Sequence, residues 1–262
     1  MNYRGLFSLD GNVIIISGGG GGIGSAIALG LSQFGASVAV VDIDAARAQA
    51  AADRIKEDGG AAIALKTNVA DEQDVESMVG AVTQRFSRID ALVNCVGFNV
   101  FRPTMELSLQ EWENVLSVNL TSAFVLSRGV ARVMASQKQG CIVNFGSVTA
   151  RFGSPGQCAY AAAKAALVNL TKTLALEWAR YNIRVNAISP VMTETPINSS
   201  WLNETPDRKR GIVQNIPAGR LGSVEDFVGP VVFLCSRASS FVRGQTIYVD
   251  GGVSAVHPLI RF

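Results

Sequence analysis

Short runs of apolar, mostly β-branched residues alternate with helix-length segments along almost the whole chain of 262 residues. Most of these runs are apolar at every position, which is typical of parallel strands covered by helices on both faces. A chain with this alternation is expected to adopt an α/β fold, a doubly wound parallel sheet with right-handed crossovers. The seven runs predicted to form strands are Val13–Ser17, Ser37–Asp42, Ala61–Val69, Asp90–Gly97, Gly140–Ser147, Ile183–Pro190 and Thr246–Gly252.

We predict a single domain over residues 1–262, because no linker rich in proline, glycine or serine interrupts the alternation. The stretch from Met192 to Gly219 departs from it, since it is polar, contains three prolines and is long for a connection. Segments of this kind often cover a ligand site. Residues 192–219 are therefore predicted to form a substrate lid.

Composition excludes several kinds of partner. The net charge is +2 and no block of like charges stands out, so neither nucleic acid nor a membrane is an expected partner. The N-terminal segment has no apolar leader and no apolar run is long enough to span a bilayer, which predicts a cytoplasmic protein. Because the four cysteines are widely separated and His257 is the only histidine, no metal site is expected. The low charged fraction, 17%, favours a surface partly covered by other subunits.

Five consecutive glycines follow the first predicted strand and are followed by Gly24 at the start of an expected helix. By composition the run is a flexible linker, whereas by position it is a cradle for phosphate, in which backbone N–H groups at a helix start face the anion. Two fingerprints fit the run. Gly19, Gly21 and Gly24 match G-x-G-x-x-G, and Gly18, Gly22 and Gly24 match G-x-x-x-G-x-G.

Asp42 ends the second predicted strand, 18 positions after Gly24. An acid about 20 residues beyond the glycines binds the adenosine ribose diol in dinucleotide-binding folds. Its carboxylate would repel a 2′-phosphate, and the glycine loop contains no lysine or arginine to receive one. The sequence therefore favours NAD over NADP. The alternative for Asp42 is a helix N-cap without a ligand role.

Ser147, Tyr160 and Lys164 form a candidate catalytic set in the segment "GSVTARFGSPGQCAYAAAK". Tyr160 and Lys164 are four residues apart, so on a helix they share one face. A neighbouring ammonium is expected to lower the pKa of the phenol, which makes Tyr160 a candidate proton donor and acceptor. Ser147 is expected at the end of a strand, where open α/β sheets bind ligands. The alternative is an exposed helical pair without a catalytic role.

The chain resembles the short-chain dehydrogenase/reductase family along nearly its full length. The matching segments are "SGGGGGIG", "NCVG", "SVNLTSAF", "FGS", "YAAAK", "RVNAISPVMTETP" and "YVDGG". The resemblance implies a single Rossmann-like domain with a seven-stranded parallel sheet, assembled as a homotetramer. It selects the G-x-x-x-G-x-G fingerprint, with Gly18, Gly22 and Gly24, and leaves Gly19 to Gly21 as spacers. The substitution Gly20→Ser is therefore expected to have a mild effect on NAD binding.

The same resemblance assigns roles that the residue patterns alone leave open. Asn119 would kink its helix and hold a water that links Lys164 to solvent, completing a catalytic set with Ser147 and Tyr160. Lys164 and Tyr160 would also contact the nicotinamide ribose. The other positions that the resemblance assigns to the cofactor, together with Asp42, are Gly18, Gly22, Ile23, Gly24, Asn68, Val69, Asn94, Gly97, Ile188 and Thr193.

The expected activity is reversible hydride transfer between NAD and a secondary alcohol or ketone. The segments "LFSLDGNV" and "IPAGRLGSVEDF" are similar to sugar-acid dehydrogenases of the gluconate 5-dehydrogenase and deoxy-ketogluconate dehydrogenase type, which favours a sugar acid or polyol as substrate. Alternatives are a 3-oxoacyl-carrier-protein reductase, a steroid or cyclic-alcohol dehydrogenase, and a non-catalytic NAD sensor. Phe98, Phe152 and Trp201 are candidate substrate contacts, with ordinary packing as their alternative.

Overall fold

The computed structural model describes residues 3–196 and 198–256, so that His257 lies outside it. Its centre is a seven-stranded, entirely parallel sheet in the order β3-β2-β1-β4-β5-β6-β7. All seven predicted strands are confirmed, although four of them are shorter than expected because their predicted ends belong to loops. The strands are β1 Val13–Ser17, β2 Ser37–Asp42, β3 Ala62–Lys66, β4 Ala91–Asn94, β5 Gly140–Phe145, β6 Ile183–Pro190 and β7 Thr246–Val249.

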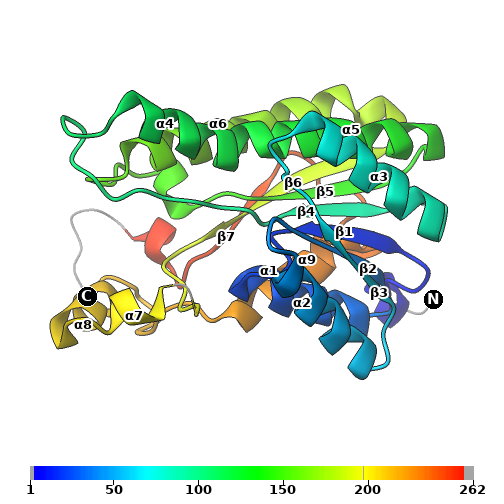
Figure 1. Cartoon of the computed structure of the whole chain (residues 1–262). Helices are drawn as coiled ribbons and strands as arrows, with labels where there is room; N and C mark the ends of the chain where they lie inside the picture. The colour runs from blue at the N-terminus through cyan, green and yellow to red at the C-terminus, as the bar shows by residue number, and fades with distance from the viewer. Residues whose placement is uncertain (1–2, 197, 257–262) are drawn as a thin grey trace.

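Helices cover both faces of the sheet (Figure 1). One layer contains α3 (Glu72–Phe86), α4 (Leu109–Leu116), α5 (Ser122–Gln137) and α6 (Cys158–Glu177). The opposite layer contains α1 (Gly22–Gln33), α2 (Ala45–Glu57) and α9 (Val228–Cys235). The doubly wound architecture expected from the sequence is thereby confirmed.

The burial of β1 explains why the strands are apolar at every position. Ile14, Ile15 and Ile16 are each fully buried, and successive side chains of a strand point to opposite faces. Ile14 and Ile16 pack in the core beneath α1, α2 and α9, whereas Ile15 packs in the second core beneath α3, α5 and α6. Each strand therefore contributes to two cores.

The register of the parallel strands brings several strand ends to one edge of the sheet. Ser17 of β1 pairs with Asn94 of β4, which in turn pairs with Asn144 of β5. The order of strands reverses between β1 and β4, and the loops that leave these two strands diverge there. Open α/β sheets bind ligands at such a point, outside the carboxyl ends of the strands.

The described part of the predicted lid, residues 192–196 and 198–219, lies apart from the two helical layers and contains helices α7 (Ser199–Leu202) and α8 (Pro206–Val213) (Figure 1). A small apolar core, made of Leu202, Ile216 and Leu221, packs this segment against neighbouring residues such as Val191 and Val253. The role of a lid remains a prediction. Over the described residues, no helix combines the length and the apolar character that crossing a bilayer requires.

Candidate active site

The glycine turn between β1 and α1 is a close backbone packing site. Gly18 has φ of 68°, in the left-handed region that favours glycine. A Cβ on Gly24 would lie 2.2 Å from the carbonyl oxygen of Gly18, and a Cβ on Gly22 would lie 3.1 Å from Cδ of Pro196. The three glycines selected by the resemblance are therefore positions where a side chain has little or no room.

Gly19 and Gly20 are not spacers, contrary to the expectation from the sequence. A Cβ on Gly20 would lie 2.6 Å from Cβ of Arg47 and 2.8 Å from its carbonyl carbon, because α2 packs directly on the turn. A Cβ on Gly19 would lie 2.9 Å from Cγ1 of Val40. Only Gly21 among the three meets nothing closer than 3.3 Å, the distance to the Gly18 carbonyl oxygen. The glycine run is thus constrained from the β2–α2 side as well as from its own helix.

A cavity of about 510 Å³ lies over this turn. Helix α1 begins after Gly21, whose N-cap position supplies no side-chain hydrogen bond, so the first N–H groups of the helix remain available to an anion. A glycine cradle beside uncapped N–H groups fits the pyrophosphate of a dinucleotide. The predicted cofactor residues that line this cavity are Gly18, Gly22, Ile23, Gly24, Asp42, Asn68, Val69 and Gly97.

Asp42 is fixed at the edge of this cavity by backbone hydrogen bonds. Its carboxylate accepts from the N–H of Gly20 and from that of Asp44, each at 3.1 Å. The N-cap of α2 is Asp44, which accepts from Ala46 and Arg47, so the alternative that Asp42 caps this helix is wrong. Arg47 also lines the cavity, and its guanidinium pairs with Asp44 at 3.1 Å. This cation therefore comes from α2 and not from the glycine loop.

Ser147, Tyr160 and Lys164 meet in a second cavity of about 640 Å³. Ser147 lies in the loop after β5, two residues beyond the end of the strand, and Tyr160 and Lys164 lie on α6. Oγ of Ser147 accepts from the N–H of Thr149 at 3.2 Å, and Ser147 and Tyr160 line the same cavity. Nζ of Lys164 lies 5.5 Å from the centre of the Tyr160 ring and donates to the carbonyl oxygen of Phe145 at 2.8 Å. The predicted spacing thus produces one compact group, and not an exposed helical pair.

Burial controls the protonation of this group. It lowers the pKa of Lys164 from 10.5 to about 8, because the ammonium is removed from water. It also raises the pKa of Tyr160, and the nearby Ser147 side chain opposes this rise. The expectation that Lys164 lowers the pKa of Tyr160 is therefore wrong for the free protein, in which desolvation of the phenol is the largest effect.

Asn119 lies in a π-helical turn, Ser117–Thr121, which separates α4 from α5 and accounts for the expected irregularity of this helix. Its Nδ2 donates to the carbonyl oxygens of Phe98 at 2.6 Å and of Val115 at 2.9 Å. Its Oδ1 accepts from the N–H of Phe98 at 3.3 Å. Asn119 thus fastens the loop after β4 to the helix beside Lys164. Its proton-relay role remains a prediction.

Comparison with known proteins agrees with this arrangement. Residues 19–254 match the family described as Enoyl-(Acyl carrier protein) reductase. The chain belongs to the short-chain dehydrogenase/reductase family. It is an oxidoreductase of the alcohol dehydrogenase and ketoreductase class, with the Rossmann-like fold of that family.

Similar family members differ in their substrates. The chain is 36% identical to 5-keto-D-gluconate 5-reductase of Escherichia coli (strain K12), over 95% of this chain and 97% of that one. It is 37% identical to 3-oxoacyl-[acyl-carrier-protein] reductase of Synechocystis sp. (94% and 98%) and 36% identical to D-threitol dehydrogenase of Mycolicibacterium smegmatis (94% of each). A solved gluconate 5-dehydrogenase from Burkholderia cenocepacia, in complex with NADP and tartrate, superposes with a TM-score of 0.93 at 34% identity (98% and 100%).

Three predicted site residues, two of them from the family resemblance, do not line the cavities. Asn94 is buried behind the cavity wall, where its Nδ2 donates to Asn144 at 2.7 Å and to Ser127 at 3.2 Å. Ile188 is fully buried in the core under α1 and α9. Phe152 is 41% exposed but does not line the catalytic cavity. Asn94 thus supports the wall from behind, whereas Ile188 and Phe152 are not among the residues that line the two cavities, and their predicted contacts stay predictions.

The catalytic cavity also contains residues that the sequence analysis did not single out. Phe98 and Trp201 line it as predicted, and Thr193 lines it together with Met192. Phe101 stacks on Trp201 with ring centres 5.8 Å apart, which joins the segment of α7 to the loop after β4. Further residues that line the cavity are Phe101, Thr149 and Gln157. Thr149 and Gln157 stand two residues after Ser147 and three before Tyr160, a proximity that could have signalled them.

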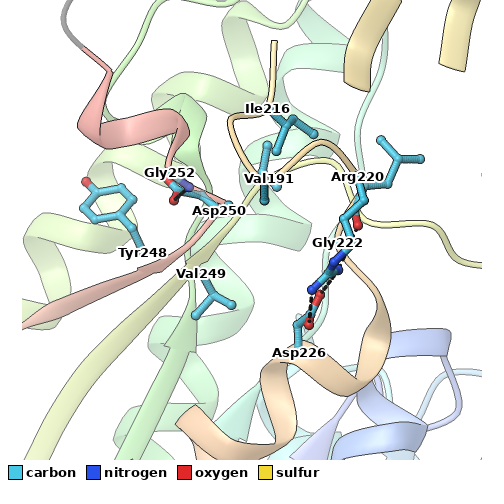
Figure 2. A pocket seen from close by; sticks show the side chains of 12 residues that line it. Val191, Ile216, Arg220, Gly222, Asp226, Tyr248, Val249, Asp250 and Gly252 are labelled. Atoms are coloured by element: carbon cyan, nitrogen blue, oxygen red, sulfur yellow. Dashed lines mark hydrogen bonds and ion pairs between the residues drawn. The ribbon is translucent and has the colours of Figure 1, made fainter. Parts of the chain in front are cut away.

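A third cavity, of about 290 Å³, lies at the ends of β6 and β7 (Figure 2). Its charged groups are already paired. Arg220 binds Asp226 through two hydrogen bonds of 2.6 and 2.8 Å, drawn as dashed lines in Figure 2. Asp250 accepts from the N–H groups of Gly252 and Ser254. These contacts stabilise the turns around the cavity. Because each of its charged side chains already has a partner, the cavity offers no unpaired charge to a ligand.

Gly20→Ala is expected to weaken NADH binding by at least about tenfold, because the new methyl group requires a shift of α2 or of the turn that cradles the cofactor. Gly80→Ala on α3 is the matched control, since its Cβ would meet nothing within 4 Å. Fluorescence titration with NADH measures both. Wild-type affinity in Gly20→Ala would contradict the packing constraint.

The buried lysine makes stability depend on pH. Because the pKa of Lys164 falls from 10.5 to about 8 on folding, the unfolded chain binds more protons between pH 8 and 10.5, and stability rises with pH in that window. The free energy of unfolding of the wild type minus that of Lys164→Met is expected to increase by about 3 kcal/mol across it. Urea denaturation at a series of pH values measures this difference. Exposed Lys172→Met serves as control, and an equal slope in both variants would refute the prediction.

Proposed function

We propose that this protein is an NAD-dependent oxidoreductase that interconverts a secondary alcohol and its ketone on a sugar-acid or polyol carbon chain. The observation that carries the proposal is the junction of the two cavities. Both are lined by Ile23, Cys95, Gly97 and Phe98, so a dinucleotide that begins at the glycine turn extends toward Ser147 and Tyr160. The relatives that act on keto-gluconate and threitol support the substrate class.

When bound, the nicotinamide supplies the hydride acceptor and donor. The chain itself handles the proton and the oxygen. In alcohol oxidation, Oη of Tyr160 takes the hydroxyl proton, and in ketone reduction it returns one. Oγ of Ser147, which lines the same cavity as Tyr160, orients the reacting oxygen. Lys164 is held by the Phe145 carbonyl oxygen with its Nζ 5.5 Å from the centre of the Tyr160 ring, where it can bind the nicotinamide ribose.

The proposed preference for NAD rests on charge at the cavity edge. The Asp42 carboxylate is held at the cavity edge by hydrogen bonds from two N–H groups. In this position it accepts hydrogen bonds from the hydroxyls of the adenosine ribose and repels a 2′-phosphate. Arg47, the cation on this side of the cavity, is paired with Asp44. A related gluconate 5-dehydrogenase is in complex with NADP. The preference proposed for this chain therefore rests on its own residues Asp42 and Arg47 and not on its relatives.

The alternative activities place different demands on the cavities. A 3-oxoacyl-carrier-protein reductase, represented among the relatives, usually takes NADPH, to which Asp42 is unsuited. A non-catalytic NAD sensor would have no use for a buried lysine, a tyrosine and a serine that line one cavity.

We also propose a cytoplasmic homotetramer. The exposed apolar side chains of Leu109, Phe124 and Leu176 on the layer of α4 to α6, and of Phe241 beside the edge strand β7, support assembly.

Tyr160→Phe is expected to lower kcat by at least about a thousandfold, because the proton donor and acceptor is removed while the ring remains. NADH binding, measured by fluorescence titration, should change by less than about threefold. The assay follows NAD reduction with a panel of polyols, sugar acids and cyclic alcohols. A variant that retains most of its kcat would contradict the assignment, as would a wild type that oxidises none of the panel and reduces none of the matching ketones.

Asp42→Ala is expected to shift the ratio of kcat/KM for NAD to that for NADP by at least about tenfold toward NADP, or about 1.4 kcal/mol. The shift has two causes: the ribose hydroxyls of NAD lose the carboxylate that accepts their hydrogen bonds, and the 2′-phosphate of NADP is no longer repelled by it. Asp53→Asn, on the exposed face of α2, is the control with the same change in net charge. A wild type that prefers NADP would contradict the cofactor preference and leave the reaction type standing.

A further inference from the structure

The side of α6 that is buried against the rest of the molecule is apolar apart from two residues. Its buried side chains are Ala159, Ala163, Lys164, Leu167, Thr171, Leu174 and Ala175. Lys164 belongs to the candidate catalytic set, whereas Thr171, which is completely buried, has no part in the chemistry proposed above. The two residues are seven positions apart, or two helical turns, so they share one face and lie roughly 10 Å apart along the helix axis.

Both polar side chains are hydrogen-bonded to neighbouring residues of β5. Nζ of Lys164 donates to the carbonyl oxygen of Phe145 at 2.8 Å, and Nδ2 of Asn144 donates to Oγ1 of Thr171 at 2.9 Å. Among the described residues, these are the two hydrogen bonds that join α6 to β5. The apolar contacts around them are not directional, whereas a hydrogen bond fixes both a distance and an angle. The position of α6 on the sheet is therefore set at two points of one strand.

Asn144 is itself held in place, so that it can anchor the helix. It is completely buried in β5, which pairs with β4 on one side and β6 on the other. Its Oδ1 accepts from Nδ2 of Asn94 at 2.7 Å, and the same nitrogen donates to Oγ of Ser127 on α5 at 3.2 Å. The hydroxyl of Thr171 donates to the carbonyl oxygen of Leu167 at 2.9 Å. Rotation of either side chain in the Asn144–Thr171 pair would thus break a second buried hydrogen bond.

The position of α6 decides whether the catalytic groups meet. Tyr160 and Lys164 lie on this helix, whereas Ser147 enters the same cavity from the loop after β5. A shift of α6 along β5 would move the first two relative to the third, and a misplacement of about 1 Å can lower a rate by about a hundredfold. The contact from Lys164 is a weak anchor, because its side chain is a flexible four-carbon stem. The short side chain of Thr171 gives the helix less freedom.

We propose that Thr171 and Asn144 are positioning residues, whose hydrogen bond sets α6 on β5 and thereby brings Tyr160 and Lys164 into place beside Ser147. The inference rests on the proposed function, since it assumes that these three residues carry the reaction. Neither Thr171 nor Asn144 lines the cofactor cavity or the catalytic cavity, so both act through the helix and not on a ligand. Their effect is therefore expected on kcat more than on NADH binding.

Thr171→Val keeps the branched shape of the side chain and removes the hydroxyl. It is expected to lower kcat by about tenfold, while the dissociation constant of NADH, measured by fluorescence titration, changes by less than about threefold. Thr171→Ser, which keeps the hydroxyl, should retain kcat within about twofold of the wild type. A Thr171→Val enzyme with wild-type kcat, or a Thr171→Ser enzyme as slow as Thr171→Val, would overturn the inference.

Two further variants separate position from stability. Asn144→Leu combined with Thr171→Val replaces both partners by apolar groups, which should recover much of the stability that Thr171→Val loses, whereas kcat should stay low. Val82→Ala, at a completely buried position of α3, lowers stability without touching α6 and should keep the wild-type kcat. Urea denaturation ranks the variants by stability. Wild-type kcat in the double variant, or a Val82→Ala enzyme as slow as Thr171→Val, would show that the pair serves stability alone.

The wild-type enzyme distinguishes failure of this inference from failure of the proposed function. If the wild type oxidises no alcohol of the panel and reduces no matching ketone, the proposed function fails, and the positioning role fails with it. If the wild type is active and Thr171→Val is equally active, the positioning role alone fails.

Discussion

The backbone contact between the glycine turn and the loop after β4 is the constraint on which both cavities depend. A Cβ on Gly18 would lie 3.2 Å from the backbone of Cys95 and Val96, so the two loops meet with no room for a side chain between them. The loop continues to Phe98, whose N–H and carbonyl oxygen are both bound by Asn119. In this way a feature of the first strand fixes the wall that the cofactor cavity and the catalytic cavity share.

Burial creates the catalytic chemistry at a cost to the free protein. Desolvation pushes Lys164 and Tyr160 toward their neutral forms, with the pKa of the lysine at about 8 and that of the phenol above its usual value. The proton therefore rests on Tyr160 in the free protein, and the nearby Ser147 side chain opposes the rise of the pKa of the phenol. A site of this kind is ready to donate a proton to a ketone, and its phenolate forms only when further stabilisation is supplied.

The sequence predicted the sheet well because each strand is buried on both faces, and a run such as Val13–Ser17 has no other stable environment. It located Ser147 and Asp42 for the same reason, since parallel strands end at one edge. It failed where the answer depends on packing between elements distant in the chain. The tight contact of Gly20 with Arg47 follows from the position of α2, and the inward orientation of Asn94 follows from its hydrogen bonds to β5 and α5.

Family membership fixes the reaction type more firmly than the substrate, and the layout of the catalytic cavity explains why. Relatives of equal similarity include a keto-gluconate enzyme and a threitol enzyme. Ser147, Tyr160 and Lys164 are held by the end of β5 and by α6, whereas Phe98, Phe101 and Trp201 reach the cavity from the loop after β4 and from α7. These latter elements lie outside the sheet, so their residues can change the shape of the cavity without disturbing the strands that position the other three.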